Sequence, residues 1–248
     1  MFRLGVITDV HANLFALGAA LRELRRQRVQ QVVHCGDAVD FGPHPRAVLE
    51  TLREHGVLCV SGNHDELLSA EIPSDFAPAI REHVHWTKNQ VDADLAAWVR
   101  AWPAQLTWRV GAVSIVATHY GTVTRHDGGR TAVSLADTPD RDDAGALDAV
   151  FRELTAPSGS IVLHGHAHRR TDVRGRLHYL SPGPCGLNLT GAGVAPCLVL
   201  EVAGEGHVEL RRCEPTYDAS ALAASVAGLP GGGEILRKFH PALALHGG

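Results

Sequence analysis

Apolar positions in the first sixty residues follow two alternating spacings. Residues 2–8 form a short β-prone run, and four leucines over 14–24 are then spaced as on one face of a helix. The same order repeats, with an apolar strand expected over 31–35, a helix over 45–55 and a third strand over 57–60. Strands that alternate with helices favour parallel pairing through helical crossovers, so we predict an α/β fold.

The rest of the chain is more varied. Residues 64–102 are helix-prone and carry three of the four tryptophans, so we expect a cap-like helical segment there. The tail over 228–248 is Gly-rich at its start, and we expect it to be loosely ordered. Between them the pattern predicts a hairpin around Gly111 over 105–117, a loop over 123–143, a helix over 144–155, a strand over 160–164 and further strands from 176 to 212.

Composition narrows the functional classes. The 248 residues are 45% hydrophobic and 20% charged, which suits one globular domain spanning 1–248. The net charge of −4, with basic residues spread along the chain, argues against nucleic acid or an anionic membrane as partner. No apolar run approaches the length of a membrane span, and five widely spaced cysteines suit a reducing compartment. We therefore expect a cytoplasmic protein.

Five short polar clusters each follow an apolar strand. Alone, each is weak, because a loop histidine is usually solvated and an Asp before a helix is usually a cap. Together they are informative, since the carboxyl ends of parallel strands meet at one edge of a sheet. Their nitrogen and oxygen donors suit ions such as Mn, Fe or Zn, and no thiolate is included. The clusters are Asp9-Val10-His11, Gly36-Asp37, Gly62-Asn63-His64-Asp65, Thr118-His119 and Gly165-His166-Ala167-His168.

In this fixed order the clusters resemble the motifs of the calcineurin-like metallophosphoesterase family, over roughly residues 3–200. Gly42-Pro43-His44-Pro45 and Tyr217-Asp218 are similar to its small bacterial phosphodiesterase-like subgroup. The resemblance implies a four-layer α/β/β/α sandwich with a dinuclear metal site at the rim where the strands end. It also implies an enzyme that hydrolyses a small phosphodiester or phosphomonoester by attack of a metal-bound hydroxide.

The resemblance further implies a role for each matching residue. Two divalent ions would be bound, with manganese preferred and iron, zinc, nickel or magnesium as alternatives. His64 would give a proton to the leaving group, and Asp65 would orient its ring or raise its pKa. As ligands, Asp9, His11 and His168 would hold the first metal, Asn63, His119 and His166 the second, and Asp37 would bridge the two.

Several alternatives stay open. The family includes scaffold proteins without catalysis, a site with one metal is conceivable, and His64 could serve only as a hydrogen-bond partner of Asp37. Relatives that act on phosphoproteins or dinucleoside polyphosphates carry an Arg that grips the phosphate, but this chain has Phe41 there, and Asp65 where they have Glu. Both substrate classes are weakened accordingly. Arg125, Arg169 and Arg170 lie near the expected rim, and the sequence assigns none of them a role.

Overall fold

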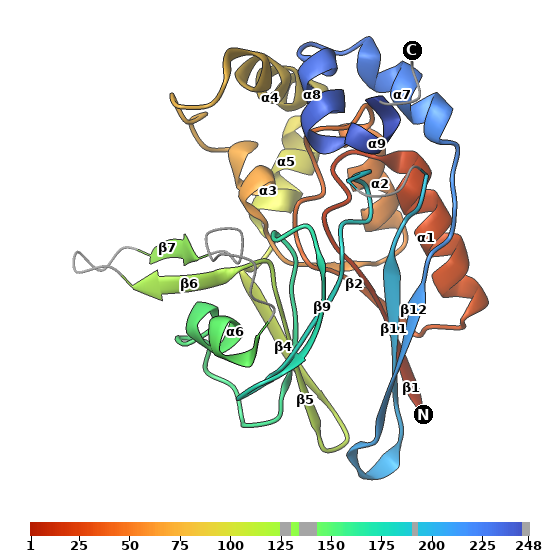
Figure 1. The fold of residues 1–248 in the computed structure, drawn as a ribbon, viewed down its shortest axis with the longest axis vertical. Coiled ribbons are helices and arrows are strands. Elements are labelled where there is room, and N and C mark those ends of the chain that lie inside the picture. The colour runs from red at the N-terminus through yellow and green to blue at the C-terminus, as the bar shows by residue number, and fades with distance from the viewer. Residues whose placement is uncertain (125–129, 134–142, 190–192, 245–248) are drawn as a thin grey trace.

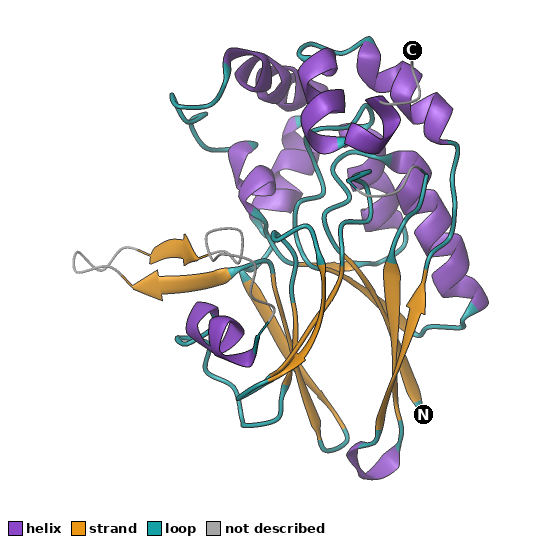
Figure 2. Ribbon diagram, viewed as in Figure 1, coloured by secondary structure: helices purple, strands orange, loops and turns teal. Residues whose placement is uncertain are grey.

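Two β-sheets packed face to face form the centre of the protein, with helices gathered at one end and on both outer faces (Figure 1). The computed structural model describes residues 1–124, 130–133, 143–189 and 193–244. Figure 2 shows that the loops between the strand ends and the helices collect along one rim. Within the described residues, no helix is both long and apolar enough to cross a bilayer.

The first sheet has the order β12-β11-β1-β2-β3. Its three strands nearest the N-terminus run parallel, as the alternating pattern predicts, and β11 pairs antiparallel with β1. The strands are β1 (Phe2–Ile7), β2 (Gln31–His34), β3 (Leu58–Cys59), β11 (Cys197–Val202) and β12 (Val208–Cys213).

The second sheet has the order β4-β5-β8-β10-β9 and is also mixed. β5, β8 and β10 run parallel, whereas β4 and β9 pair antiparallel at its two edges. Gly111, at φ 58°, forms the turn of the predicted hairpin between β4 and β5. The strands are β4 (Gln105–Val110), β5 (Val113–Thr118), β8 (Ile161–Leu163), β9 (Arg170–Arg174) and β10 (His178–Pro182).

Three apolar layers hold the sandwich together. Leu4, Val33 and Leu198 of the first sheet meet Ile115 and Leu163 of the second in a buried layer between the sheets. A second layer lies under the helices α1 (Leu14–Arg26), α2 (Pro45–Glu54) and α5 (Ala93–Arg100), and a third under α6 (Ala144–Val150) on the outer face of the other sheet. The predicted α/β/β/α arrangement is therefore confirmed.

Helix α1 begins where its sequence dictates. The Asn13 side chain accepts a hydrogen bond from the amide of Ala16 at 3.0 Å, which satisfies one of the free donors of the first turn. The same side chain donates to the carbonyl of Gly186 at 2.8 Å, so the start of α1 is tied to the loop that follows β10.

Two expectations for the chain outside the sheets are wrong. The stretch 123–143 is not all loop, because β6 (Gly121–Thr124) and β7 (Arg130–Val133) form a hairpin that projects from the sandwich (Figure 1); residues 125–129 and 134–142 lie outside the described residues. The tail is not loose as far as residue 244; residues 245–248 lie outside the described residues. Its glycines precede α8 (Gly232–Phe239), and Ile235, Leu236 and Phe239 give this helix an apolar face that packs against the body.

The expected cap-like segment is helical, with α3 (Asn63–Leu67), α4 (Pro78–Gln90) and α5. The C-terminal helices α7 (Ala219–Ala227), α8 and α9 (Pro241–Ala244) join it at the same end of the molecule (Figure 1). Val84 of α4, Leu222 of α7, Ile235 of α8 and Phe41 from the rim share one buried apolar cluster. The helical end therefore sits directly on the rim.

Candidate metal centre

Five strands of the two sheets end at the rim, and each is followed by one of the polar clusters. Asp9 follows β1, Asp37 follows β2 and Asn63 follows β3; His119 follows β5, and His166 and His168 follow β8. The two sheets face each other, so residues more than a hundred positions apart in sequence meet above the layer between them (Figure 2).

The first group of possible ligands combines Asp9, His11, Asp37 and His168, with one donor atom from each lying within 4.8 Å of all the others. His168 Nε2 lies 3.4 Å from Asp9 Oδ1 and 3.3 Å from His11 Nε2. Two imidazole nitrogens at that distance need a proton or a cation between them. This group therefore has the donors and the spacing of a metal site.

The second group shares Asp37 with the first and adds His119 and His166, again with donor atoms within 4.8 Å. His119 Nε2 lies 3.2 Å from Asp37 Oδ2. The side-chain oxygen of Asn63 is buried and has no hydrogen-bond partner among the described residues, which is rare for a buried acceptor. A cation beside it would satisfy that oxygen.

Two of the imidazoles are fixed by main-chain carbonyls. His11 Nδ1 donates to the carbonyl of Val39 at 3.0 Å, and His119 Nδ1 donates to the carbonyl of Cys35 at 2.7 Å. Both bonds place a proton on Nδ1 and turn Nε2 toward the carboxylate of Asp37. Histidines that bind metals in proteins are oriented by the same kind of bond.

The backbone at this rim is strained. Asp9, His11, Asp37, His166 and His168 have φ of 52°, 45°, 60°, 67° and 50°, in the left-handed region that side-chain-bearing residues avoid. Each such residue costs about 1–3 kcal/mol and persists only where the surrounding structure enforces it. The strained residues coincide with five of the seven predicted ligands, and such coincidence is characteristic of functional sites.

The glycines of the motifs make room for the site. A Cβ on Gly62 would lie 2.2 Å from Asp37 Oδ1, and one on Gly165 would lie 2.1 Å from Thr8 Oγ1. Thr8 donates a hydrogen bond to Asp9 Oδ2 at 2.7 Å. Because Gly165 has no side chain, it leaves room for the threonine that holds this carboxylate. Both positions therefore require glycine, because a side chain there would collide with Asp37 or Thr8.

Burial and mutual charge set the ionisation of the cluster. Burial opposes the ionisation of Asp37, but the neighbouring imidazoles of His119 and His64 outweigh it and keep its pKa well below the usual range. Burial lowers the pKa of His166 to about 4, and that of His11 falls well below 6.5 for the same reason. Burial would lower the pKa of His119, but the charge of Asp37 and the hydrogen bond to it raise that pKa to about 9. Ionised carboxylates beside the neutral rings of His11 and His166 are the forms that bind a divalent cation, and a cation at His119 would take the place of its Nε2 proton.

His64 lies at the edge of both groups. Its main-chain amide donates to Asp37 Oδ1 at 2.9 Å, and its ring nitrogen Nδ1 is 2.8 Å from Asp40 Oδ2. Burial by itself would lower the pKa of His64, but the charge of Asp37 and the hydrogen bond to Asp40 together raise it. Nε2, the nitrogen remote from Asp40, is the one left to act on a substrate.

Asp65 was expected to orient the ring of His64 or to raise its pKa. The first expectation is wrong, whereas the charge of Asp65 is among the causes that raise the pKa of His64. Asp65 accepts hydrogen bonds from the main-chain amides of Asp37, Ala38 and Gly62 at 2.8, 2.8 and 3.0 Å, so it fastens two of the motif loops to each other. The residue that orients the ring is Asp40. It stands within the stretch Gly36-Asp37-Ala38-Val39-Asp40, so a signal was present in the sequence, but no spacing rule links it to His64.

Phe41 places an apolar side chain at the position where some relatives carry the arginine that grips the phosphate. Its ring stacks on Phe239 of α8 with centroids 3.6 Å apart and touches the ring of His64 at 4.5 Å. The side chain is buried, and the main-chain carbonyl of Phe41 accepts a hydrogen bond from His240 at 3.1 Å. The position of the phosphate-gripping arginine is thus part of the core beneath the C-terminal helices.

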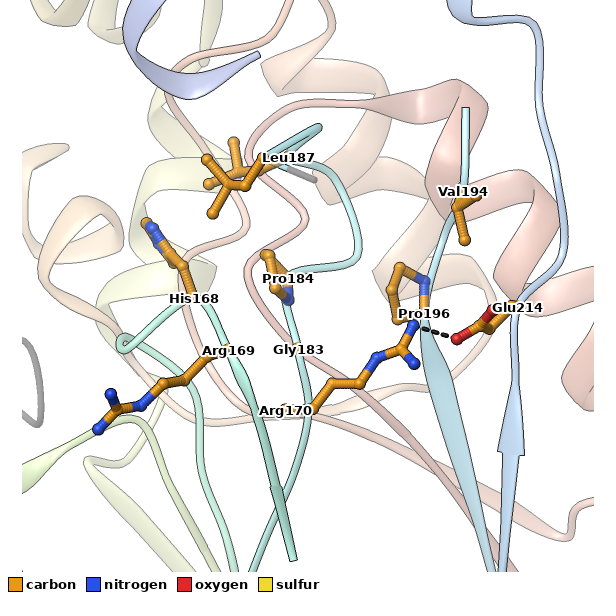
Figure 3. Close-up of a pocket in the computed structure, with 10 residues that line it drawn as sticks. His168, Arg169, Arg170, Gly183, Pro184, Leu187, Val194, Pro196 and Glu214 are labelled. Atoms are coloured by element: carbon orange, nitrogen blue, oxygen red, sulfur yellow. Dashed lines mark ion pairs between the residues drawn. The ribbon is translucent and has the colours of Figure 1, made fainter. Parts of the chain in front are cut away.

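The three arginines near the expected rim have no role assigned by the sequence. His164, which follows β8 directly before the last motif, is buried against the ring of Phe151. Arg170 forms an ion pair with Glu214. Arg169 points to the opposite side from Arg170 (Figure 3), and Arg125 lies outside the described residues.

The fit to divalent cations follows from three observations: two groups of nitrogen and oxygen donors share one carboxylate, the imidazoles of His11 and His119 turn Nε2 toward that carboxylate, and the Asn63 oxygen is buried without a partner among the described residues. Mixed imidazole and carboxylate donors are the set that Mn, Fe, Zn and related ions accept.

Comparison with known proteins agrees with this geometry. The family model described as calcineurin-like phosphoesterase superfamily domain matches residues 2–205. A metallophosphoesterase from Sphaerobacter thermophilus is 23% identical with TM-score 0.68, and a hypothetical protein from Pyrococcus horikoshii is 18% identical with TM-score 0.77. In both cases 96% of this chain aligns with 97% of the other. At these identities the two structures show the fold.

A curated relative, an uncharacterised protein from Methanocaldococcus jannaschii, is 26% identical over 117 residues. The match covers 47% of this chain and spans about half the length of that relative, 48%.

Proposed function

This chain belongs to the calcineurin-like phosphoesterase superfamily, whose family model covers residues 2–205, and from that premise we propose that it hydrolyses a small organic phosphodiester or phosphomonoester with two divalent metal ions. Membership implies metal-dependent phosphoester hydrolysis. The substrate size, the number of ions and the residue roles are the proposal.

The observation that carries the proposal is Asp37, which belongs to both groups of donors. A carboxylate shared by two neighbouring cations offsets their repulsion. In this assignment Asp9, His11 and His168 hold one ion, Asn63, His119 and His166 hold the other, and Asp37 bridges them. Manganese is the preferred ion, since harder oxygen donors and imidazoles are mixed and no thiolate is present.

Divalent cations supply, when bound, electrophilic assistance to the phosphoryl group and a nucleophile at neutral pH. The chain's own contribution is positional. Main-chain carbonyls of Val39 and Cys35 keep His11 and His119 in one orientation, and Thr8 holds Asp9. Because Asp9 and Asp37 are almost fully buried, little water competes for their oxygens.

His64 is the proposed proton donor to the leaving alcohol. Its ring is fixed through Nδ1 by Asp40, and Phe41 packs against one side of it. A fixed imidazole presents its proton in one direction, which is the requirement for general acid catalysis. A scaffold role without catalysis would not need a buried His–Asp pair beside seven convergent donors, so these residues support an enzyme.

The decisive experiment combines metal content with turnover. We expect about two Mn²⁺ per chain after loading and hydrolysis of 4-nitrophenyl phosphate or bis(4-nitrophenyl) phosphate, since the two donor groups share one bridge. Asp37→Asn keeps the shape of the side chain but removes its charge, and it should abolish turnover and lower metal content by at least one ion per chain, measured by atomic emission.

Asp172→Asn is the matched control, because Asp172 also binds a histidine, His178 at 2.8 Å, but on the edge strand β9 away from both donor groups. It should retain turnover and metal. Less than one metal per chain in the wild type, together with no turnover of either ester, would end the proposal.

A further inference from the structure

A cavity of about 570 Å³ opens beside His168 (Figure 3). Its walls come from the start of β9, the loop after β10, and the strands β11 and β12 near their rim ends. His168 and Leu187 stand at one end, whereas Val194, Pro196 and Glu214 stand at the other. The cavity therefore runs outward from the metal centre between the open edges of the two sheets.

The lining is largely apolar. Pro184, Leu187, Leu189, Val194 and Pro196 supply the apolar surface. Of the three charged residues that line the cavity, Arg170 and Glu214 form an ion pair and so neutralise each other, whereas the side chain of Arg169 points to the side opposite Arg170 (Figure 3). A cavity with this lining favours an uncharged organic group over a second phosphate.

The cavity adjoins the candidate metal centre at one residue and one loop. His168 Nε2 faces Asp9 and His11, and the same residue forms the inner wall of the cavity. The amide of Gly186 donates to the carbonyl of Asp9 at 2.9 Å, so the loop that carries Pro184 and Leu187 is fixed to the strand end that carries Asp9. A group attached to a phosphate bound beside His168 would therefore lie next to the inner end of the cavity.

Two other cavities lack this connection. One of about 580 Å³, lined by Val29 and Gln31, lies at the opposite end of β2 from Asp37. Another, of about 640 Å³, is lined by Arg109, Arg174 and His207 near the hairpin turns far from the rim. Size therefore does not single out the cavity at His168, but its position does.

Building on the proposed function, we propose that this cavity receives an uncharged aromatic or other apolar substituent of the phosphoester substrate. The flat faces of Pro184, Pro196 and the His168 ring suit a ring better than a flexible chain. Cavities of roughly 300–1,000 Å³ are the usual size for a drug-sized group, so the space fits one or two fused rings. The substrate class is then an organic phosphoester with a ring close to its phosphate.

The test compares two phosphonates that the enzyme cannot hydrolyse, methylphosphonate and 1-naphthylphosphonate, as competitive inhibitors of the Mn²⁺-loaded protein. In the wild type the naphthyl compound should bind at least about tenfold more tightly, because burial of the rings adds apolar contact. Val194→Trp fills the cavity and should reduce this preference to below about threefold, with Val194→Phe in between.

Val29→Trp is the matched control, since Val29 is also a half-buried valine that lines a cavity of nearly equal volume. It should keep the wild-type preference. Equal affinity for the two phosphonates in the wild type, or an unchanged preference in both Val194 variants that circular dichroism shows to be folded, would overturn the inference.

Calorimetric binding of the same phosphonates separates this inference from the proposed function, because it requires no turnover. A protein that prefers the naphthyl compound and loses the preference in Val194→Trp, yet hydrolyses no ester, would refute the proposed hydrolysis and support the cavity. A protein that hydrolyses esters but binds both phosphonates equally would support the proposed hydrolysis and refute the inference about the cavity.

Discussion

The ring of His64 is held by a side chain that is distant from it in sequence and close in space. Asp40 lies 24 positions earlier and binds Nδ1 at 2.8 Å, while Asp37 accepts the main-chain amide of His64 at 2.9 Å. The carboxylate nearest in sequence, Asp65, is used to fasten loops instead. At the scale of single residues, sequence neighbours and functional partners therefore differ.

His64→Ala should slow alkyl or phenyl esters by about 10²–10⁴ in kcat, the usual contribution of a general acid, and 4-nitrophenyl esters far less. A poor leaving group needs the proton, whereas 4-nitrophenolate departs without it. The measurement is kcat for a series of esters that differ in leaving-group pKa.

His85→Ala, which removes an exposed histidine on α4, is the control and should leave the series unchanged. Asp40→Asn should also slow esters with poor leaving groups more than esters with good ones, but by a smaller factor of about 10–100, as expected when a supporting hydrogen bond is weakened. Equal slowing of good and poor leaving groups in His64→Ala would show that His64 is not the proton donor.

Gly62→Ala should lower metal content and shift the rim backbone. Its Cβ would lie 2.2 Å from Asp37 Oδ1 and 2.5 Å from the main-chain nitrogen of Asp37, so the shared carboxylate and the backbone that carries it must move. Gly204→Ala is the matched control, because nothing lies within 4 Å of a Cβ there and its φ is ordinary. Metal per chain after dialysis is the measurement, and normal metal content in Gly62→Ala would contradict the proposed position of Asp37 in the site.

At the scale of elements, helix α8 reaches the metal centre through a stack of rings. Phe239 lies on Phe41, and Phe41 touches both His64 and His11. The helix lies nearly two hundred positions later in the sequence, yet it forms the backing of the proposed proton donor. Stacked rings of this kind contribute about 0.5–1.5 kcal/mol beyond the area that they bury.

Phe239→Leu should therefore lower stability by about 1–2 kcal/mol and also reduce kcat for poor leaving groups, because Phe41 and His64 lose their support. Phe2→Leu is the control: Phe2 is also half-buried and apolar in its contacts, but it lies at the far end of β1. It should lower stability without changing the dependence on leaving group. Urea unfolding and the ester series measure the two effects, and an unchanged series for Phe239→Leu would contradict the supporting role of α8.

At the scale of the whole molecule, the C-terminal segment is joined to the rim through a buried histidine. His240 donates from Nε2 to the carbonyl of Phe41 at 3.1 Å and accepts from Asn188 at Nδ1. Acceptance at Nδ1 requires the neutral ring, because a protonated Nδ1 has no lone pair for the Asn188 amide. Burial lowers the pKa of His240 from 6.5 to about 4.

This histidine should make stability depend on pH. Between pH 6.5 and 4 the unfolded chain binds a proton at His240 that the folded chain does not, so the free energy of unfolding falls as the pH falls through this range. The full effect is about 3 kcal/mol. In His240→Gln the free energy of unfolding should fall less steeply between pH 7 and 5, with a slope smaller by the equivalent of up to about one bound proton. Urea unfolding at a series of pH values measures this slope.

Leu243→Ala is the control, because it removes buried apolar contact from the same segment and should lower stability without changing the slope. The same slope in His240→Gln as in the wild type would show that His240 is not the residue that takes up the proton.

The sequence by itself determined the strands that lead to the rim, the positions where they end and the chemistry placed there, but not the hairpin of β6 and β7. Periodicity gave the βαβ order from Phe2 to Cys59, and the motifs placed Asp9, Asp37 and Asn63 at strand ends. These features are local: a strand pattern fixes where its chain leaves the sheet, and parallel strands leave at one edge. The family followed from the order of the motifs, and the match over residues 2–205 agrees with it.

Only the tertiary structure decided which side chains meet. Asp40 rather than Asp65 orients His64, the tail packs as α8 and α9 against Phe41, and a largely apolar cavity opens beside His168. Each of these depends on how the two sheets and the helical end are placed relative to each other. Packing of that kind is decided by contacts between residues far apart in the chain, and local patterns of hydrophobic and polar residues do not specify those contacts.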